Sequence, residues 1–177
     1  MRRLIIPALL VLALAIPALV AARAGTTFRA QLHELNGSGA NGTATATVNG
    51  STLTVHIVAT GLENGAHLRH IHGGPTAVAG GSSVEVSKCP TPRADADGDG
   101  IISVAEGVPD YGAVIINLGN FATSTGSIDE TLTFPNFDQS VLPLDRRAIV
   151  LHGMTGPNGY DASIPIVCGQ LHARGGE

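Results

Sequence analysis

Polar and apolar residues alternate in several short segments of this chain. The two clearest segments carry apolar side chains at every second position, namely Ala44, Ala46 and Val48 in residues 43–48 and Leu53, Val55, Ile57 and Ala59 in residues 51–60. Successive side chains of a β-strand point to opposite faces, so this pattern predicts two strands that each bury one face. The intervening Asn49-Gly50 favours a tight hairpin turn.

Six further segments predict strands in the same way. They cover residues 27–35, 66–72, 113–118, 127–134, 147–152 and 165–172. About eight short strands without a long helical period are typical of an all-β fold, either a Greek-key β-barrel or a sandwich. The series is interrupted at residues 73–112 by about 40 residues rich in Gly, Ser, Pro and Asp, and we expect so long a loop to be functional or tied down.

The first 24 residues have the pattern of a secretory signal peptide. Arg2 and Arg3 precede an apolar run over residues 4–20, and residues 22–24 form a small-x-small cleavage site. An uncleaved anchor is the alternative. We therefore expect residues 25–177 to form one β domain that is secreted, periplasmic or in the cell envelope, with no membrane span after cleavage.

Composition and charge indicate which classes of binding partner the protein can have. The chain has four Phe, two Tyr and no Trp, and removal of residues 1–24 takes away three Arg and no acidic residue, so the formal net charge falls from −4 to −7. Scarce aromatic residues and the lack of a basic patch argue against nucleic-acid binding. Metal ions are the expected partners, and the sequence names no protein partner.

The two cysteines, Cys89 and Cys168, stand far apart in a chain that is expected to be exported. An oxidising compartment favours one disulfide between them, with two free thiols as the alternative. Such a bond closes a loop of 79 residue steps. Chain-entropy arithmetic for a loop of that size gives a stabilisation of about 4–5 kcal/mol.

The histidines near residue 70 are the first candidate site. His70 and His72 share one face of the expected strand, about 7 Å apart along it, and could bind one metal ion. His152, which ends the apolar run of residues 148–151, is a candidate third ligand. Three His ligands with an open position suit copper or catalytic zinc. The alternative is that these are ordinary polar residues at a strand end. His67 falls on the opposite face, where a structural role is expected.

Residues 95–106 match the spacing of a twelve-residue calcium loop. The expected ligands are Asp95, Asp97, Asp99, the Ile101 carbonyl, Ser103 and Glu106, at positions 1, 3, 5, 7, 9 and 12. Pro90 and Pro92 prevent an ordinary incoming helix, and residues 101–107 have room for a turn or two before Pro109. We expect a calcium loop without a full helix–loop–helix hand. A solvated acidic turn is the alternative.

Several of these motifs resemble known families. Residues 61–73 (GLENGAHLRHIHG), Cys89, residues 146–153 (RRAIVLHG) and residues 164–171 (IPIVCGQL) stand in the order found in copper/zinc superoxide dismutases. The loop CPTPRADADGDGIISVAEGVPDYG resembles that of secreted bacterial proteins with a CHRD domain, a related β fold. The resemblance covers most of residues 27–172.

The dismutase pattern implies that His70, His72 and His152 are copper ligands, that His67 is structural, and that the Cys89–Cys168 disulfide pins the long loop to the barrel. Two departures bear on activity. Residues 73–151 contain no His, so the bridging histidine and the zinc ligands of the dismutases have no counterpart there. Their active-site arginine falls at Pro165 here.

Three functions follow from these patterns. The first is an exported metal-binding module of CHRD type, with calcium and the disulfide as structural elements and without efficient dismutase activity. The alternative is a copper-dependent superoxide dismutase that uses the three histidines. A copper chaperone or buffer would use the same ligands without turnover. Whether the chain is an enzyme is left open by its sequence.

Overall fold

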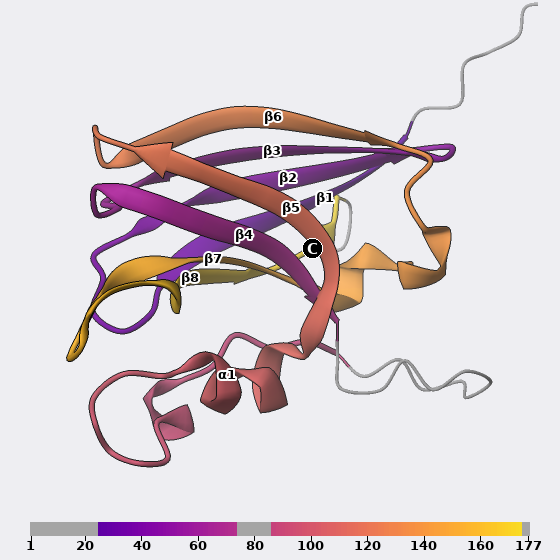
Figure 1. Cartoon of the computed structure of the whole chain (residues 1–177). Coiled ribbons are helices and arrows are strands. Elements are labelled where there is room, and N and C mark those ends of the chain that lie inside the picture. Colours follow the sequence, from indigo (N-terminus) through magenta and orange to yellow (C-terminus); the bar gives the residue numbers. More distant parts are fainter. Residues whose placement is uncertain (1–24, 74–85, 175–177) are drawn as a thin grey trace, which may run out of the picture.

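Nine β-strands and one α-helix form the part of the chain that this computed structural model describes, residues 25–73 and 86–174 (Figure 1). The strands are β1 (Thr26–Glu34), β2 (Asn41–Asn49), β3 (Thr52–Thr60), β4 (Gly65–Gly73), β5 (Ala113–Thr123), β6 (Ser127–Pro135), β7 (Ala148–Gly156), β8 (Gly159–Gln170) and β9 (His172–Ala173). The helix α1 covers Val104–Tyr111. Short 3-10 helices lie at Pro92–Ala94, Gln139–Val141 and Leu144–Arg146. The expected signal peptide lies outside the described residues.

The strands form one antiparallel sheet that curls into a nearly closed barrel. Its order is β5-β4-β7-β8-β1-β2-β3-β6, and β9 pairs with β1. The two end strands, β5 and β6, follow one another in the sequence and lie side by side in Figure 1. The all-β fold and the eight main strands expected from the alternation are confirmed. Among the described helices, none is long and apolar enough to cross a membrane.

The hairpin of β2 and β3 shows how the sequence specifies the barrel wall. Asn49 pairs with Thr52 at its tip, and Gly50 takes a φ of 57°, which a tight hairpin turn requires. Ala44 faces Ile57 and Ala46 faces Val55, and all four side chains are buried in the barrel core. The alternation of small and branched side chains therefore fills the interior, while the threonines between them face outward.

Arg69 contacts both end strands of the sheet, β5 and β6, where the barrel is not closed by strand pairing. Its side chain is buried, its Nε donates to the carbonyl of Leu118 in β5, and its Nη1 lies 2.6 Å from the Glu130 carboxylate in β6. The guanidinium also lies over the ring of Phe121, 5.1 Å from its centroid. A buried cation needs partners of this kind. Arg69 therefore connects β4 to both end strands of the sheet.

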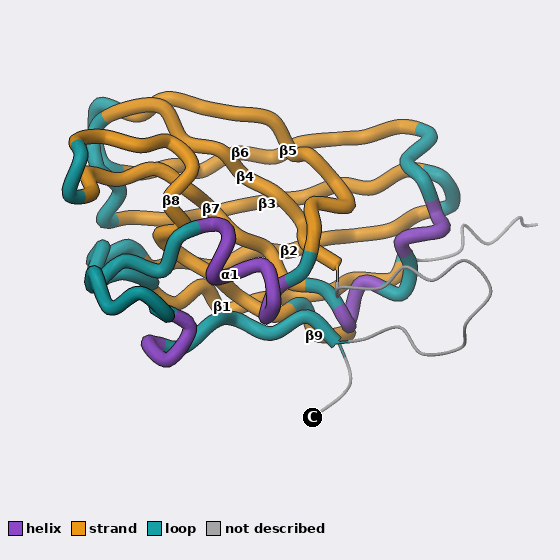
Figure 2. The backbone as a smooth tube through the Cα atoms, turned by 60° about the horizontal axis from the view of Figure 1, so that its bottom comes forward, coloured by secondary structure: helices purple, strands orange, loops and turns teal. Residues whose placement is uncertain are grey.

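A second, smaller core lies outside the barrel. It consists of Leu35, Tyr111, Ala148, Val150 and Cys168. Figures 1 and 2 show α1 and the loop before it lying beside β7 and β8. Residues 86–112 of the long loop therefore cover part of the outer face of the barrel with apolar side chains, and this part of the loop is tied down as expected.

Helix α1 runs further than the sequence suggested. Residues 101–107 were expected to make a turn or two before Pro109, yet the helix passes through Pro109 and ends at Tyr111. Proline at this position removes the donor for the carbonyl four residues earlier, at Ala105. Ala105 is exposed, so that carbonyl can be solvated. A capping box of Ser103 and Glu106 starts the helix.

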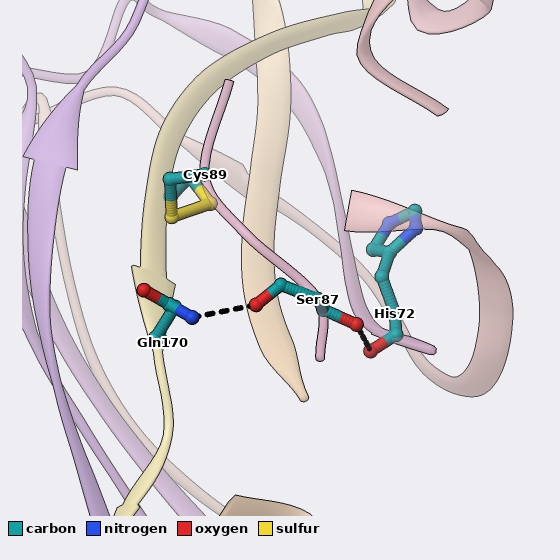
Figure 3. The surroundings of a disulfide bond; sticks show 5 residues. His72, Ser87, Cys89 and Gln170 are labelled. Carbon is teal, nitrogen blue, oxygen red and sulfur yellow. Dashed lines mark hydrogen bonds between the residues drawn. A yellow bond between two sulfur atoms is a disulfide. The ribbon is translucent and has the colours of Figure 1, made fainter. Parts of the chain in front are cut away.

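The expected disulfide between Cys89 and Cys168 is confirmed. It fastens the long loop to β8 at Cys89, and Ser87, two residues earlier, adds hydrogen bonds. Figure 3 shows Ser87 between Gln170 and His72: its carbonyl accepts from the Gln170 amide at 2.6 Å, and its hydroxyl donates to the His72 carbonyl at 3.3 Å. Ser87 is fully buried. Ser87 therefore links the loop beside the disulfide to both β4 and β8.

We expect replacement of both cysteines by serine to lower the free energy of unfolding by about 4–5 kcal/mol, because the unfolded chain regains the entropy of the open loop. Urea unfolding of the oxidised protein and of the Cys89→Ser/Cys168→Ser variant measures the difference. Reductant should destabilise the wild type and leave the variant unchanged. Equal midpoints for the two oxidised proteins would contradict the assigned role.

Candidate metal centre

Strand β4 sends its histidines to two different faces. His67, Arg69 and Ile71 are buried on the barrel side, whereas His70 and His72 occupy the alternate positions on the outer side. The pairing of β4 with β7 sets Leu68 opposite His152. Residues opposite one another share a face, so His152 joins His70 and His72 on the outside of the barrel.

The three outer histidines form a compact cluster. One ring nitrogen from each of His70, His72 and His152 lies within 4.8 Å of the other two. The ring centroids of His70 and His152 are 5.1 Å apart, and His70 Nδ1 lies 3.4 Å from His152 Nε2. The distance between ring centroids is 5.5 Å for His70 and His72 and 5.8 Å for His72 and His152. The structure thus brings together the three residues that the sequence pattern singled out.

Backbone carbonyls hold two of these rings. His72 Nδ1 lies 2.9 Å from the Gly112 carbonyl, and His152 Nδ1 lies 2.7 Å from the Ser163 carbonyl. A carbonyl oxygen accepts only, so each Nδ1 carries the proton and each Nε2 keeps its lone pair. His72 Nε2 is fully buried and has no hydrogen-bond partner within the described residues. Such an orphaned lone pair costs free energy unless a donor or a cation meets it.

Burial keeps these imidazoles neutral. Desolvation lowers the pKa of His72 to about 4 and that of His152 to about 3, while the hydrogen bonds to Gly112 and Ser163 oppose the shift. Burial also lowers the pKa of His70, which is half-buried. A metal ion binds the neutral ring, so it has no proton to displace from His72 Nε2 or His152 Nε2 at neutral pH.

His67 lies apart from the cluster, inside the barrel. Its two ring nitrogens lie 2.9 Å from the His152 carbonyl and 2.8 Å from the Glu63 carbonyl. The ring stacks on Phe121 with a centroid distance of 5.1 Å. These contacts hold the backbone of His152 from the inner side, and His67 lies on the face of β4 opposite to His70 and His72, as the alternation predicted.

In residues 95–106, called the acidic loop from here on, three of the expected calcium ligands lie close together. Asp95, Asp97 and Asp99 each offer a carboxylate oxygen within 4.8 Å of the others. Gly98 and Gly100 have φ values of 77° and 88°, a backbone that favours glycine, and their amides donate to the Asp95 carboxylate at 2.9 and 3.0 Å. The loop thus folds around its own aspartates.

Glu106 lies outside that group of aspartates. Its carboxylate accepts hydrogen bonds from the Ala96 amide at 2.9 Å and from the Ser103 amide and hydroxyl, both at 2.8 Å. These bonds, above all those from Ser103, lower the pKa of Glu106 to about 2. The carboxylate therefore stays ionised and ties the start of the loop to the start of α1, and the Ser103 hydroxyl is used in the same cap.

Asn36 is an anchor of the loop that the sequence did not reveal. Its side-chain oxygen accepts from the Ile102 amide at 2.7 Å, and its amide group donates to the carbonyls of Ile102 and Pro165. An Asn-Gly dipeptide such as Asn36-Gly37 favours a turn, and Asn36 takes a φ of 58°. Nothing in that dipeptide pointed to a partner 66 residues away.

The other histidines lie elsewhere on the surface. His33, His56 and His172 are exposed and belong to no metal-ligand cluster of the described residues. His56 lies in β3 with its Nε2 2.8 Å from the Asp129 carboxylate. These three residues provide matched controls for the outer cluster.

Comparison with known families identifies the β-domain. Residues 28–137 match the family model of the CHRD domain, and this is more than half of the chain. The chain therefore belongs to the CHRD domain family. The match includes His70, His72 and the acidic loop and ends before β7, so His152 and Cys168 lie beyond it. No curated protein matches the chain.

The lowered pKa values predict how pH changes the stability of the metal-free protein. The histidines of the unfolded chain have a pKa near 6.5, whereas the pKa of folded His72 is about 4 and that of folded His152 is about 3. Their contribution to the free energy of unfolding is therefore fully present above about pH 6.5 and is lost as pH falls toward the two lower values. Each group contributes a slope of at most about 1.4 kcal/mol per pH unit. Urea unfolding from about pH 7.5 to pH 4.5 measures that slope.

The His72→Gln/His152→Gln variant should show a shallower slope than the wild type over the same range. The matched variant His33→Gln/His172→Gln changes two exposed histidines for which no ion pair is seen among the described residues, and it should keep the wild-type slope. Identical slopes for all three proteins would show that the buried rings do not carry this dependence.

Proposed function

We propose that this chain is an exported metal-binding β-barrel module that holds one copper ion with His70, His72 and His152. The proposal rests above all on the buried His72 Nε2, a lone pair without a partner within the described residues that faces two further imidazoles. A dry polar atom of this kind is stabilised when a cation binds. The disulfide is compatible with an oxidising compartment, which supports export.

The donor set suits copper. Imidazole nitrogen binds copper, zinc, iron and nickel, and Cu(II) binds most tightly among the divalent ions at a given site of nitrogen donors. His72 and His152 are nearly enclosed, whereas His70 is half-buried, so the cluster has one side nearer to solvent. Three ligands with an accessible side leave room for a further small ligand.

A binding role is favoured over efficient dismutation. Copper bound here would supply one-electron redox chemistry. The chain, however, has no histidine in residues 73–151 and carries Pro165 where the dismutase pattern has an arginine. The domain is also acidic overall, which is unfavourable for attracting an anion. A storage or delivery role would use the same three ligands.

A copper-dependent superoxide dismutase is the second candidate. The observation in its favour is the half-buried His70, which leaves the cluster accessible to a small anion. His67, on the inner side, would then act as a structural residue that holds the backbone of His152. The two candidates share the ligand set and differ in turnover.

The acidic loop is proposed as a calcium site with a structural role. Asp95, Asp97 and Asp99 provide hard oxygen donors within reach of one ion, and the Ile101 carbonyl, Ser103 and Glu106 are the further ligands that the spacing suggests. Recruitment of Glu106 or Ser103 requires the cap at the start of α1 to rearrange. Calcium would then stabilise the loop that covers the outer face of the barrel.

We expect the metal-free protein to bind one equivalent of Cu(II), and the His70→Ala/His72→Ala/His152→Ala variant to lose that site, because all three nitrogen donors are removed. Isothermal titration with a competing chelator measures both. The matched variant His33→Ala/His56→Ala/His172→Ala removes the three exposed histidines and should bind like the wild type. Equal binding by the wild type and the cluster variant would refute the copper proposal.

Superoxide turnover separates the two candidate functions. A binding module should show no more activity than free copper once a chelator has removed loosely held ions. Activity that survives the chelator and is absent from the cluster variant would establish the dismutase instead.

Calcium should bind the loop with a dissociation constant on the order of 10⁻⁴–10⁻³ M, as single extracellular sites do. The Asp97→Asn/Asp99→Asn variant should lose this binding and the accompanying rise in thermal stability. The matched variant Asp129→Asn/Asp145→Asn changes the net charge equally at two exposed sites and should respond like the wild type. Thermal unfolding with and without millimolar calcium compares them, and an equal rise in all three would rule the loop out.

A further inference from the structure

The end of helix α1 lies directly against one of the clustered histidines. The carbonyl oxygen of Gly112, the residue after the helix, lies 2.9 Å from His72 Nδ1. The ring of Tyr111, the last helical residue, lies 4.5 Å from the His72 ring between centroids. Two adjacent residues of the long loop thus contact a single side chain of β4.

The carbonyl decides which nitrogen of His72 carries the proton. An imidazole held by a carbonyl at Nδ1 donates from Nδ1 and presents an unprotonated Nε2. A ring nitrogen of His72 lies within 4.8 Å of ring nitrogens of His70 and His152, and Nε2 is the one that the Gly112 carbonyl leaves unpartnered. Without that acceptor, the proton could move to Nε2, and His72 would lose its ability to bind a metal through this atom.

Gly112 can offer its carbonyl in this direction because it is glycine. Its φ of 86° and ψ of −174° lie in a region of backbone conformation that other residues rarely adopt. The Gly112 amide at the same time donates to the Val108 carbonyl at 2.8 Å and ends the helix. The end of α1 and the direction of the Gly112 carbonyl are therefore set together.

The Tyr111 ring packs against the His72 ring. It is fully buried, its hydroxyl donates to the Val104 carbonyl at 3.2 Å, and it belongs to the outer core with Cys168 and Val150. A β-carbon at Gly107 would collide with the Tyr111 ring, so the absence of a side chain at Gly107 makes room for the ring in this position. Water is thereby kept from the covered face of His72, which is 2% exposed.

We propose that Tyr111 and Gly112 are the positioning residues of the histidine cluster: the Gly112 carbonyl fixes the tautomer of His72, and the Tyr111 ring holds that imidazole dry and in place. The role in metal binding rests on the proposed copper site, whereas the tautomer is a property of the metal-free protein. Acceptors that orient a ligand in this way change metal affinity by about 10- to 100-fold when they are lost.

The test compares the wild type with Gly112→Ala, which strains the backbone that directs the carbonyl, and with Gly107→Ala, which displaces the Tyr111 ring without touching His72. The matched control is Gly119→Ala, because Gly119 has a nearly equal φ of 84° and open space around its α-carbon. Long-range ¹H–¹⁵N spectra of the metal-free proteins identify the tautomer of His72. Chelator competition measures Cu(II) affinity.

We expect His72 to carry its proton on Nδ1 in the wild type and in Gly119→Ala, with Cu(II) affinities within about twofold of one another. Gly112→Ala should give a mixture of tautomers and an affinity roughly 10- to 100-fold lower, and Gly107→Ala should also weaken binding. A purely structural role would lower stability alike in Gly112→Ala and Gly119→Ala and leave tautomer and affinity unchanged.

Three results separate this inference from the proposed function. A wild-type His72 with its proton on Nε2 overturns the positioning role, and it needs no variant to fold. A wild type with the Nδ1 proton but no affinity for Cu(II) confirms the tautomer and refutes the copper site. Full affinity in Gly112→Ala overturns the positioning role and leaves the copper site standing.

Discussion

The register between β4 and β7 is the constraint on which the histidine site depends. Because side chains alternate along β4, His70 and His72 share the outer face, and the pairing of Leu68 with His152 adds the third ring to that face. A slip of one residue would send His152 into the barrel. His67 counters such a slip, since its buried ring contacts the His152 carbonyl from the inner side. The hydrophobic core that fixes the register therefore also fixes the site.

The long loop completes what the strands begin. Its disulfide to β8, the hydrogen bonds of Asn36 to Ile102 and the cap between Ser103 and Glu106 hold the loop and α1 against the outer face. The apolar side chains beneath it make a second small core, and the end of α1 reaches His72. Outer-face histidines of a barrel are ordinarily solvated, whereas here the end of α1 covers His72 and leaves it 2% exposed. The loop therefore contributes to the chemistry of the site as well as to stability.

The barrel and the shared face of His70 and His72 could be foreseen because both follow from a two-residue period that is visible in the sequence, whereas His152 is indicated by its place at the end of an apolar run and by the resemblance to the dismutases. Extensions of the strands could not be foreseen: β5 and β8 run through polar residues such as Asn120 and Asp161, whose pairing depends on neighbouring strands. The same holds for α1, which continues through Pro109 because the capping box and the outer core support it. The carbonyls of Gly112 and Ser163 left no trace in the sequence either, since every residue has one. Such acceptors emerge only when the fold brings distant backbone together.

The most direct test of the account is anomalous scattering from crystals of the domain grown with copper and calcium. Data collected at the copper edge should show one strong peak among His70 Nδ1, His72 Nε2 and His152 Nε2, with the Gly112 carbonyl still accepting from His72 Nδ1. A copper peak at His56 and Asp129, or at another exposed histidine, with none at the cluster, would contradict the central claim that the barrel and its covering loop build a copper site.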